Sequence, residues 1–561
     1  MREPAPRESA WIAETMASRL LLPSIIAIAL VLRLPGLGES LWYDELWSTH
    51  VVLGNVTALA RTIGADVHPP FYAVVMFVWI RLFGDSEISV RMLPLICGLL
   101  TIVLTARLAA GYGWRRAAPV AALILAISPP HIWYSQEARH YSLLMLLLTA
   151  YTCAFHRIRQ THARRWYVAC ALLALCMALT HYFAIAYVAA ITLLALGDPR
   201  ARARMLWIGG AIACVLAAFL TARWRFAFLP GQPGYLHEFG FGDAWRLMFE
   251  WYVTGGALGR PENRATTVRL GVLGVQLALL ALVVRGLFHA RVAPALGVSH
   301  ESRWEALARR WELALLLLIL PSALLALDLL GTKRFYIERS AISGLPFFAI
   351  AMGIGATSFR SVRWRALSTA LIAAFGAVVL LNYYAQPDEW TVYKPNADWR
   401  AAARWLSARR APSGPPVVVV ALTPPLELLY YDEGFGMREL EDSSTHAAAT
   451  GDDAGSDGVR EWLKRRFAIP VDPRRGRTGR IYVPLEPDVA LVHRIMDREQ
   501  GSEFFLARNR YWPGSSDRMI KALEADPSLR VQLAFEAKGI RLLRIRPTLT
   551  HRTVSLDRSA R

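Results

Sequence analysis

Residues 18–45 read SRLLLPSIIAIALVLRLPGLGESLWYDE, an apolar run that is followed closely by two adjacent carboxylates. The run from 18 to 34 approaches the roughly 20 residues that a helix needs to cross the hydrocarbon of a bilayer. Asp44 and Glu45 then stand just beyond the membrane exit, next to Trp42 and Tyr43. Ionisable groups are costly near hydrocarbon, so this pair is either a functional site or a solvated cap at a helix start.

Similar apolar runs follow along the first two thirds of the chain. The chain has 561 residues, of which 54% are apolar, and a mean hydropathy of +0.30, which indicates an integral membrane protein. Eleven segments are expected to cross the membrane: 18–34, 91–109, 117–134, 139–156, 166–181, 182–197, 205–221, 269–288, 312–330, 341–357 and 366–384. We therefore predict a polytopic α-helical membrane domain over residues 1–384.

The stretch from Phe71 to Phe83 is apolar but only about a dozen residues long, which is typical of an interfacial or re-entrant helix. If it is not a crossing, alternate loops collect the arginines, at 107–116, 157–165, 200–204, 285–310 and 360–365. The positive-inside rule makes these loops cytoplasmic, together with the N-terminus before an uncleaved first helix. An odd number of crossings then exports the C-terminal part, and Phe71–Phe83 is expected along the outer surface.

The net charge of +19 follows largely from these arginine-rich loops, which suit the anionic lipid of a cytoplasmic leaflet. A nucleic-acid partner is therefore not expected. All five cysteines fall in apolar spans, which predicts neither a disulfide framework nor a thiolate metal site.

A separate soluble α/β domain is predicted over residues 385–561. Strands are expected at Val417–Leu422, Arg480–Pro484, Glu503–Ala507 and Gly539–Ile545, and helices at Asp398–Arg409, Gly458–Phe467 and Asp517–Ala525. The acidic segment Glu441–Asp457 is expected to form a flexible loop, and the tail after Thr548 to be disordered.

With this topology, carboxylates, basic residues and aromatics meet on the outer face. They come from the first outer loop, from the ends of later crossings and from the segment 333–339. This mixture suits sugar transfer from a lipid-linked phosphate, in which a carboxylate accepts the proton of the acceptor and cations stabilise the leaving phosphate. Aromatic side chains can stack on a sugar or simply anchor the helices at the interface.

Four motifs in this order resemble those of the GT-C glycosyltransferases of the protein O-mannosyltransferase and aminoarabinose transferase superfamily, especially bacterial family-39-like members. They are Asp44-Glu45, His68-Pro69-Pro70-Phe71-Tyr72, Ser86-Glu87 with Arg91, and Ser135-Gln136-Glu137-Ala138-Arg139-His140-Tyr141-Ser142. The resemblance covers about residues 18–390. It implies a GT-C fold, a polyprenyl-phosphate monosaccharide donor, inversion at the anomeric carbon, and an acceptor that is an envelope glycan, a lipid or a protein.

The resemblance also implies roles for individual residues. Asp44 becomes the catalytic carboxylate and Glu45 a supporting acid, while the His-Pro-Pro motif starts a surface helix. The donor phosphate and sugar are expected to contact residues from several outer segments: His68, Arg91, Glu137, Arg139, His140, Tyr141, Arg334 and Arg339. Either Arg339 or one of Lys333 and Arg334 matches the arginine that opens a late helix in these proteins.

Simpler explanations stay open for some of these side chains. His68 can be a helix-entry residue, Arg91 can pair with Glu87 across one helical turn, and groups at a crossing end such as Arg139 can snorkel. Paired acids with a histidine could hold magnesium or manganese. The first outer loop has no dense carboxylate cluster of the Asp-x-Asp kind, however, and the resemblance implies relatives that generally work without a metal, so we expect no metal or other cofactor.

Two other functions compete with a transferase. A transporter or flippase of lipid-linked sugars predicts charges at helix centres and two pseudo-symmetric halves, whereas here the charges stand at crossing ends, with Asp328 as the ambiguous case. A non-catalytic scaffold leaves Asp44, Glu45 and Arg139 unexplained.

Overall fold

The structure is a computed structural model, and it describes residues 6–49, 56–65, 68–222, 250–254, 266–289, 303–330, 342–385, 397–411, 413–421, 426–432, 435–438, 479–482, 489–500, 502–509 and 513–548. The chain forms two compact units. The first contains Met1–Leu37 and Leu59–Tyr393, and the second contains Gly38–Ala58 and Lys394–Arg561. The short segment that carries Asp44 and Glu45 therefore groups with the C-terminal part of the chain.

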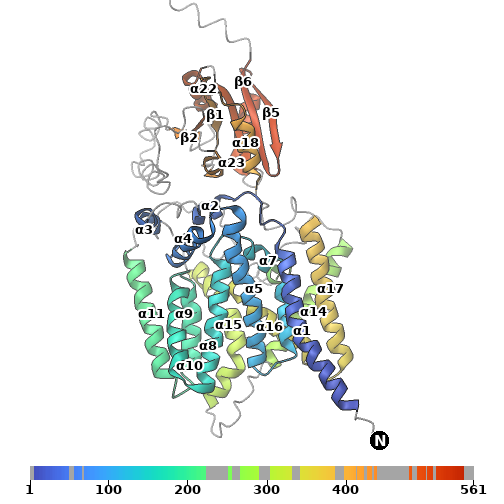
Figure 1. The fold of residues 1–561 in the computed structure, drawn as a ribbon. Coiled ribbons are helices and arrows are strands. Elements are labelled where there is room, and N and C mark those ends of the chain that lie inside the picture. The colour runs from blue at the N-terminus through green and yellow to red at the C-terminus, as the bar shows by residue number, and fades with distance from the viewer. Residues whose placement is uncertain are drawn as a thin grey trace, which may run out of the picture. The chain divides into compact units, whose positions relative to one another are not determined.

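The first unit is a bundle of helices (Figure 1). Its helices are α1 (Pro6–Arg33), α4 (Phe71–Phe83), α5 (Glu87–Gly111), α6 (Ala117–Ile127), α7 (Pro129–Ser135), α8 (Tyr141–Thr161), α9 (Arg164–Ala178), α10 (Ala184–Ala195), α11 (Arg202–Ala222), α14 (Thr266–His289), α15 (Arg303–Leu330), α16 (Leu345–Thr357) and α17 (Val362–Ala385), and α3 (Val56–Ala65) precedes α4. A helix stands at each of the predicted crossings, so the predicted helical architecture is confirmed.

Several of these helices are long and apolar enough to span a bilayer. Among the described residues, α5, α8, α11, α14 and α17 meet this criterion by length and composition, and α6 with α7 makes a sixth if the bent pair is one span. Shorter apolar helices include Leu20–Arg33, Ala184–Ala195, Trp311–Leu324 and Ile342–Thr357. The chain is thus a multi-pass membrane protein, and the count of eleven crossings stays a prediction.

Helix α16 forms the centre of the bundle, with every side chain from Leu345 to Ala356 buried. It lies so close to α14 that a Cβ atom on Gly286 would stand 1.7 Å from the carbonyl oxygen of Ala351. On the facing helix, a Cβ on Gly355 would stand 1.8 Å from the carbonyl oxygen of Leu282. Small residues permit this approach, which is the usual way for helices to pack tightly in a membrane.

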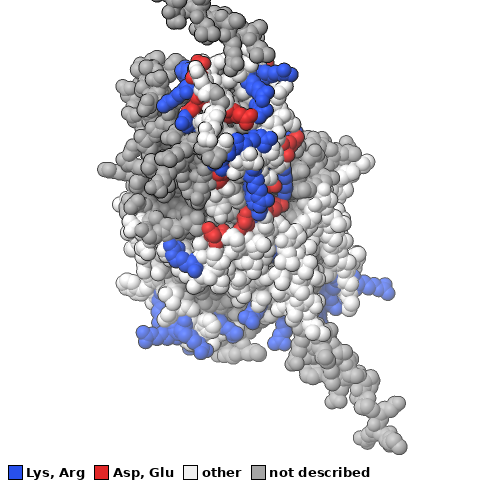
Figure 2. Space-filling model, turned by 45° about the horizontal axis from the view of Figure 1, so that its top comes forward, with Lys and Arg blue, Asp and Glu red and all other residues white. Residues whose placement is uncertain are grey.

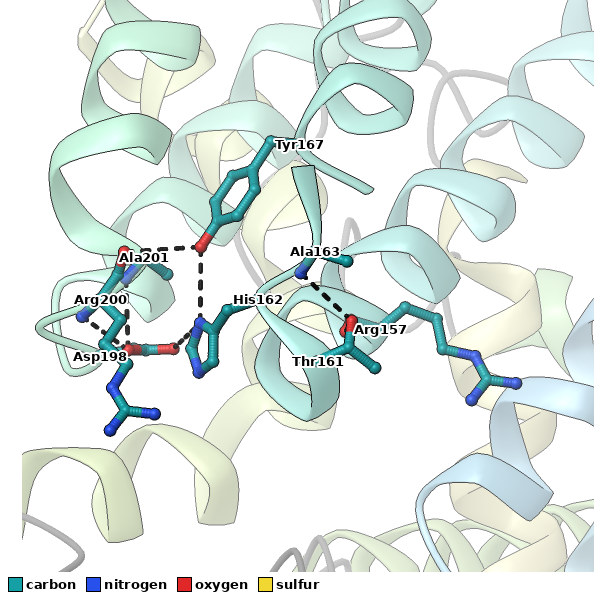
Figure 3. Close-up of polar contacts among 8 residues, drawn as sticks. All are labelled: Arg157, Thr161, His162, Ala163, Tyr167, Asp198, Arg200 and Ala201. Atoms are coloured by element: carbon teal, nitrogen blue, oxygen red, sulfur yellow. Dashed lines mark hydrogen bonds and ion pairs between the residues drawn. The ribbon is translucent and has the colours of Figure 1, made fainter. Parts of the chain in front are cut away.

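At one end of the bundle, a polar cluster joins the loop between α8 and α9 to the loop between α10 and α11 (Figure 3). Asp198 accepts hydrogen bonds from the backbone of Arg200 and Ala201, and its other oxygen lies 3.8 Å from Nδ1 of His162. The end of the helical unit that lies lowest in Figure 2 carries Lys and Arg side chains. The α8–α9 and α10–α11 loops include two of the arginine-rich segments, 157–165 and 200–204, that the sequence analysis assigns to the cytoplasm.

The second unit is built around a six-stranded sheet of order β2-β3-β1-β4-β6-β5. Its elements are α2 (Tyr43–Thr49), α18 (Trp399–Ser407), β1 (Val417–Val420), α19 (Leu426–Tyr431), β2 (Phe435–Arg438), β3 (Gly479–Tyr482), α22 (Val489–Arg498), β4 (Glu503–Asn509), α23 (Pro513–Ala525), β5 (Leu529–Ala537) and β6 (Ile540–Pro547). Strands β2, β3, β1 and β4 are parallel, whereas β6 is antiparallel to both β4 and β5.

Helices cover both faces of this sheet, which explains the continuous apolar run of β1. Val417 and Val419 pack against α18 and α19, while Val418 and Val420 pack against α22 and α23. The soluble α/β fold and its four predicted strands are confirmed. Strands β2 and β5 and helices α19 and α22 were not predicted, and the predicted helix 458–467, loop 441–457 and tail after 548 lie outside the described residues.

Candidate functional site

Three histidines from distant parts of the first unit meet in one cluster: His68, His140 and His181. Each offers a ring nitrogen, and these nitrogens lie within 4.8 Å of one another. The ring centroids are 4.6 Å apart for His68 and His140, 5.0 Å for His140 and His181, and 5.7 Å for His68 and His181. His140 and His181 are buried, and His68 is half-buried.

Three helix ends bring these histidines together. His68 stands just before α4, His140 is the N-cap residue of α8, and His181 follows the last turn of α9. The backbone N–H of Phe71 donates to the carbonyl of Leu179 at 2.8 Å, which ties the start of α4 to the end of α9. The prolines after His68 therefore begin a helix against a fixed neighbour, which sets the position of the imidazole.

Arg139 adds a permanent positive charge to the cluster. Its Nη2 donates to Nε2 of His68 at 3.2 Å, and its side chain is buried. Because a guanidinium only donates hydrogen bonds, Nε2 of His68 accepts, and the proton of the neutral ring is assigned to Nδ1. The predicted site residues His68, Arg139 and His140 thus lie together, and Glu137 is buried in the same turn.

A sharp bend between α6 and α7 sets the position of the turn that carries Glu137, Arg139 and His140. Helices α6 and α7 meet at 65° at Ser128, where Pro129 and Pro130 interrupt the regular hydrogen bonds of the predicted crossing 117–134. The fully buried Arg33 donates to the freed carbonyls of Leu125 and Ala126, each at 3.1 Å, and to Nδ1 of His131 at 2.7 Å. The last residue of α1 therefore stabilises the bend that leads into residues 135–140.

Aromatic rings surround the cluster. The ring centroid of Tyr141 lies 4.3 Å from that of His140 and 4.7 Å from that of Tyr134. The ring of Tyr72 on α4 meets His140 edge-on, with the two centroids 6.3 Å apart. Ser142 donates to the carbonyl of Tyr134 at 2.6 Å, which closes the turn between α7 and α8. The cluster therefore combines nitrogen donors with flat apolar faces.

The donor set could take up either a metal ion or an anion. Three imidazole nitrogens suit a transition metal such as zinc. Arg139, however, lies 3.2 Å from the ring nitrogen of His68 and would repel a divalent cation at that point. The same charge attracts an oxyanion and forms short charge-assisted hydrogen bonds with it, so an oxyanion fits this arrangement better than a metal ion.

The predicted catalytic pair lies on α2, in the second unit. Glu45 is almost fully buried, and its Oε2 accepts a hydrogen bond from the backbone N–H of Trp42 at 3.3 Å. This is the reciprocal half of a helix cap, in which an acid in the first turn satisfies the N–H of the residue before the helix. Asp44 is half-buried. The cap engages Glu45, which is compatible with a supporting role for this residue.

The remaining predicted residues have different positions. Arg91 is buried and donates to the carbonyl oxygens of Gly36 at 3.2 Å and Leu37 at 2.9 Å, so it holds the chain just after α1. Lys333, Arg334 and Arg339 lie outside the described residues. Two neighbours were not among the predicted site residues: His181, which had the same signal of a histidine at a crossing end, and Arg33, which resembles an ordinary snorkelling arginine.

One known family and several solved structures are similar to parts or most of this chain. Residues 67–224 match the family model described as dolichyl-phosphate-mannose-protein mannosyltransferase. No curated protein matches the chain. Among solved structures, ArnT from Cupriavidus metallidurans bound to undecaprenyl phosphate matches with a TM-score of 0.40, 17% identity, and coverage of 96% of this chain and 98% of that chain.

A second similar structure is the archaeal oligosaccharyltransferase AglB from Archaeoglobus fulgidus, in complex with an inhibitory peptide and a dolichol-phosphate. Its TM-score is 0.45 at 12% identity, with coverage of 97% of this chain and 75% of that chain. The family match includes His68, Arg91, Arg139, His140 and His181. For residues 67–224, which carry this cluster, the family match confirms the resemblance to GT-C glycosyltransferases of the protein O-mannosyltransferase type.

Proposed function

We propose that this chain is an inverting membrane glycosyltransferase. It transfers one monosaccharide from a polyprenyl-phosphate donor to an acceptor on the extracytoplasmic face of a bacterial inner membrane. The observation that carries the proposal is the contact of the buried Arg139 with the half-buried His68, within the group of three histidines. The family match over the same residues and the undecaprenyl phosphate bound to the ArnT structure support a lipid-linked phosphate as the ligand.

In this proposal the cluster binds the phosphate that leaves. The C1–O bond between sugar and phosphate breaks as the bond from the acceptor to C1 forms on the opposite face. Arg139 compensates the charge that grows on the phosphate oxygens, and His68 and His140 donate further hydrogen bonds to them. Glu137 and Tyr141, in the same turn and at the start of α8, contact the sugar or the first isoprene unit.

Asp44 accepts the proton of the acceptor in this proposal, and Glu45 supports it by fixing the start of α2. Arg91 acts on the reaction by holding the chain that leads to this helix. Arg334 and Arg339 supply a further phosphate contact, and the reaction needs no divalent metal. The acceptor is an envelope glycan, a lipid or a protein hydroxyl.

The test uses purified protein, membrane extract and polyprenyl-phosphate donors that carry a radiolabelled sugar. A transferase moves the label from the lipid to an acceptor and leaves free polyprenyl phosphate, whereas a flippase moves the intact lipid across the bilayer. We expect label transfer by the wild type and none by Asp44→Asn. Equal transfer by both proteins would refute the role of Asp44, and transport of intact donor without transfer would refute the proposed function.

A further inference from the structure

The segment that carries the proposed base is attached to the C-terminal unit, although it follows the first helix in sequence. Residues Gly38–Ala58 group with Lys394–Arg561 as one compact unit. This grouping includes all of α2, and therefore both Asp44 and Glu45. The soluble part of the chain thus has a structural connection to the acidic segment that the sequence alone does not reveal.

Four consecutive residues of the segment each contact the soluble fold. Arg400 donates to the carbonyl of Gly38 at 2.6 Å, and Nζ of Lys538 lies 2.6 Å from Oε1 of Glu39. The hydroxyl of Ser40 donates to Asp398 at 3.1 Å. The backbone N–H of Leu41 donates to the hydroxyl of Tyr431 at 2.7 Å, and Leu41 itself is fully buried.

These contacts come from rigid parts of the soluble fold. Asp398 is the N-cap of α18, where it accepts from the N–H of Ala401 at 3.0 Å, and its own N–H donates to the carbonyl of Lys538 at 2.7 Å. Lys538 stands in the tight turn between β5 and β6. Tyr431 ends α19, whose Leu428 is packed in the same core as α18. The contact residues therefore do not move independently of the sheet.

The hydrogen-bonded attachment leads directly into α2, which itself packs against α19. The hydrogen bond of Leu41 is followed at once by the cap between Trp42 and Glu45, and Asp44 lies in the first turn of the helix. In the first unit, Arg91 binds the two carbonyls just before the segment. Within the second unit, the backbone of Gly38 and Leu41 and the side chains of Glu39 and Ser40 are therefore bound directly before α2 starts.

One of these contacts adds little to the stability of the fold. The ion pair of Lys538 and Glu39 is about one-third exposed on each side, and exposed pairs contribute little to folding. We propose that the C-terminal unit positions α2 and its carboxylates for the transfer reaction, with Tyr431, Asp398 and Lys538 as positioning residues. This inference rests on the proposed function only for the role of Asp44.

The first test compares Tyr431→Phe with Tyr482→Phe in the full-length protein. Both variants remove one tyrosine hydroxyl from the same unit, but Tyr482 donates to Glu499 and not to the segment. Hydrogen–deuterium exchange of residues 38–49 should become faster in Tyr431→Phe only. The same variant should lower kcat by roughly two- to tenfold, the loss expected for one hydrogen bond, with the KM for donor unchanged.

The second test exchanges the charges of the ion pair. Glu39→Lys and Lys538→Glu should each accelerate exchange of residues 38–49 and lower kcat, and the double variant should recover both. Arg541→Glu is the matched control, because Arg541 pairs at 2.6 Å with Glu536 on the same hairpin and not with the segment. It should leave exchange of residues 38–49 and kcat unchanged.

Two results would overturn the inference. Unchanged exchange of residues 38–49 in Tyr431→Phe and in both single charge variants would show that these residues do not anchor the segment. Faster exchange with unchanged kcat, in a background where Asp44→Asn is inactive, would show that the anchoring does not position the base. Full activity of Asp44→Asn instead refutes the proposed base itself, while exchange still decides whether the segment is anchored.

Discussion

Two polar clusters within the helical unit differ in composition, and the difference separates structure from chemistry. Where the ends of α5 and α8 meet α15, the buried Glu312 accepts hydrogen bonds from Arg159 and from Tyr112. The other cluster gathers His68, His140 and His181 around Arg139. The first joins a carboxylate to its donors, whereas the second collects imidazoles next to a guanidinium.

The first kind of cluster recurs in the soluble unit, where Glu499 accepts from Arg480 and Tyr482. Burial acts to raise the pKa of Glu499, but the hydrogen bonds from Arg480 and Tyr482 outweigh it and lower that pKa. A Glu–Arg–Tyr group joins α22 to β3 there, as it joins three helices in the bundle. Such a trio is complete without a ligand, whereas the histidine–arginine cluster has the composition of an anion site.

The largest expected effect on folding is in Arg159→Met. It leaves the buried carboxylate of Glu312 without the guanidinium, which should cost about 3–5 kcal/mol of stability. Unfolding in mixed micelles of increasing SDS measures this loss. Activity per folded molecule should stay near the wild-type value. A large loss of activity at unchanged stability would mean that the trio takes part in the reaction.

The matched substitution in the other cluster is Arg139→Met. It should lower kcat roughly 100- to 1000-fold, as expected when a group that stabilises transition-state charge is removed. Its effect on unfolding in the same SDS titration should be smaller than that of Arg159→Met. If Arg139→Met kept full activity but lost stability, the histidine–arginine cluster would be a structural element and not the site of the reaction.

A smaller effect is expected for His181→Asn. The ring of His181 accepts from the N–H of Phe183 at 3.2 Å through Nδ1 and faces both other histidines. Loss of one imidazole should raise the KM for donor roughly tenfold, with a modest change in kcat. Steady-state kinetics over a range of donor concentrations measure it, and an unchanged KM would remove His181 from the site.

A pH effect on stability is expected in the C-terminal unit. Hydrogen bonds from His493, and then from Ser528, lower the pKa of Asp526 to about 2. Because the folded-state pKa is depressed, the stabilisation is present above the ordinary carboxyl pKa of about 4 and is lost as the pH falls through about 2. When the pH is lowered from 5 to 2.5, the Tm measured by calorimetry should therefore fall by less in Asp526→Asn than in the wild type. An equal loss in both proteins would contradict this assignment.

Chelation should have the smallest effect. If the cluster binds an oxyanion, EDTA treatment leaves the transfer rate unchanged, and zinc added afterwards does not raise it. Metal analysis of the purified protein accompanies the assay. Loss of activity with EDTA that zinc restores would show that the cluster is a metal site.

Much of this architecture could be predicted from sequence because apolar length is a strong signal for helices in a bilayer. The four predicted strands were equally clear, since β1 is four consecutive valines covered on both faces. Strand β5, by contrast, mixes exposed polar residues with apolar ones and lies at the edge of the sheet. Its pairing with β6 depends on a neighbour that local sequence does not specify.

The site was predictable only in part. The sequence indicated that His68, Arg139 and His140 share a face, but not that a third histidine completes their cluster. It also did not reveal that Arg33 stabilises the bend between α6 and α7, because a buried arginine and a snorkelling one look the same in sequence. The attachment of residues 38–41 to the C-terminal unit depends on contacts across more than 350 positions of chain, such as that of Ser40 with Asp398 (|i−j| = 358).

The most direct test of the central claim is an experimental structure of the protein with undecaprenyl phosphate bound. We predict that the phosphate lies against Arg139 with its oxygens in hydrogen-bond reach of His68 and His140, and that Arg139→Met loses this density. A phosphate bound away from these side chains, or a metal ion held by the three histidines with the phosphate elsewhere, would contradict the account.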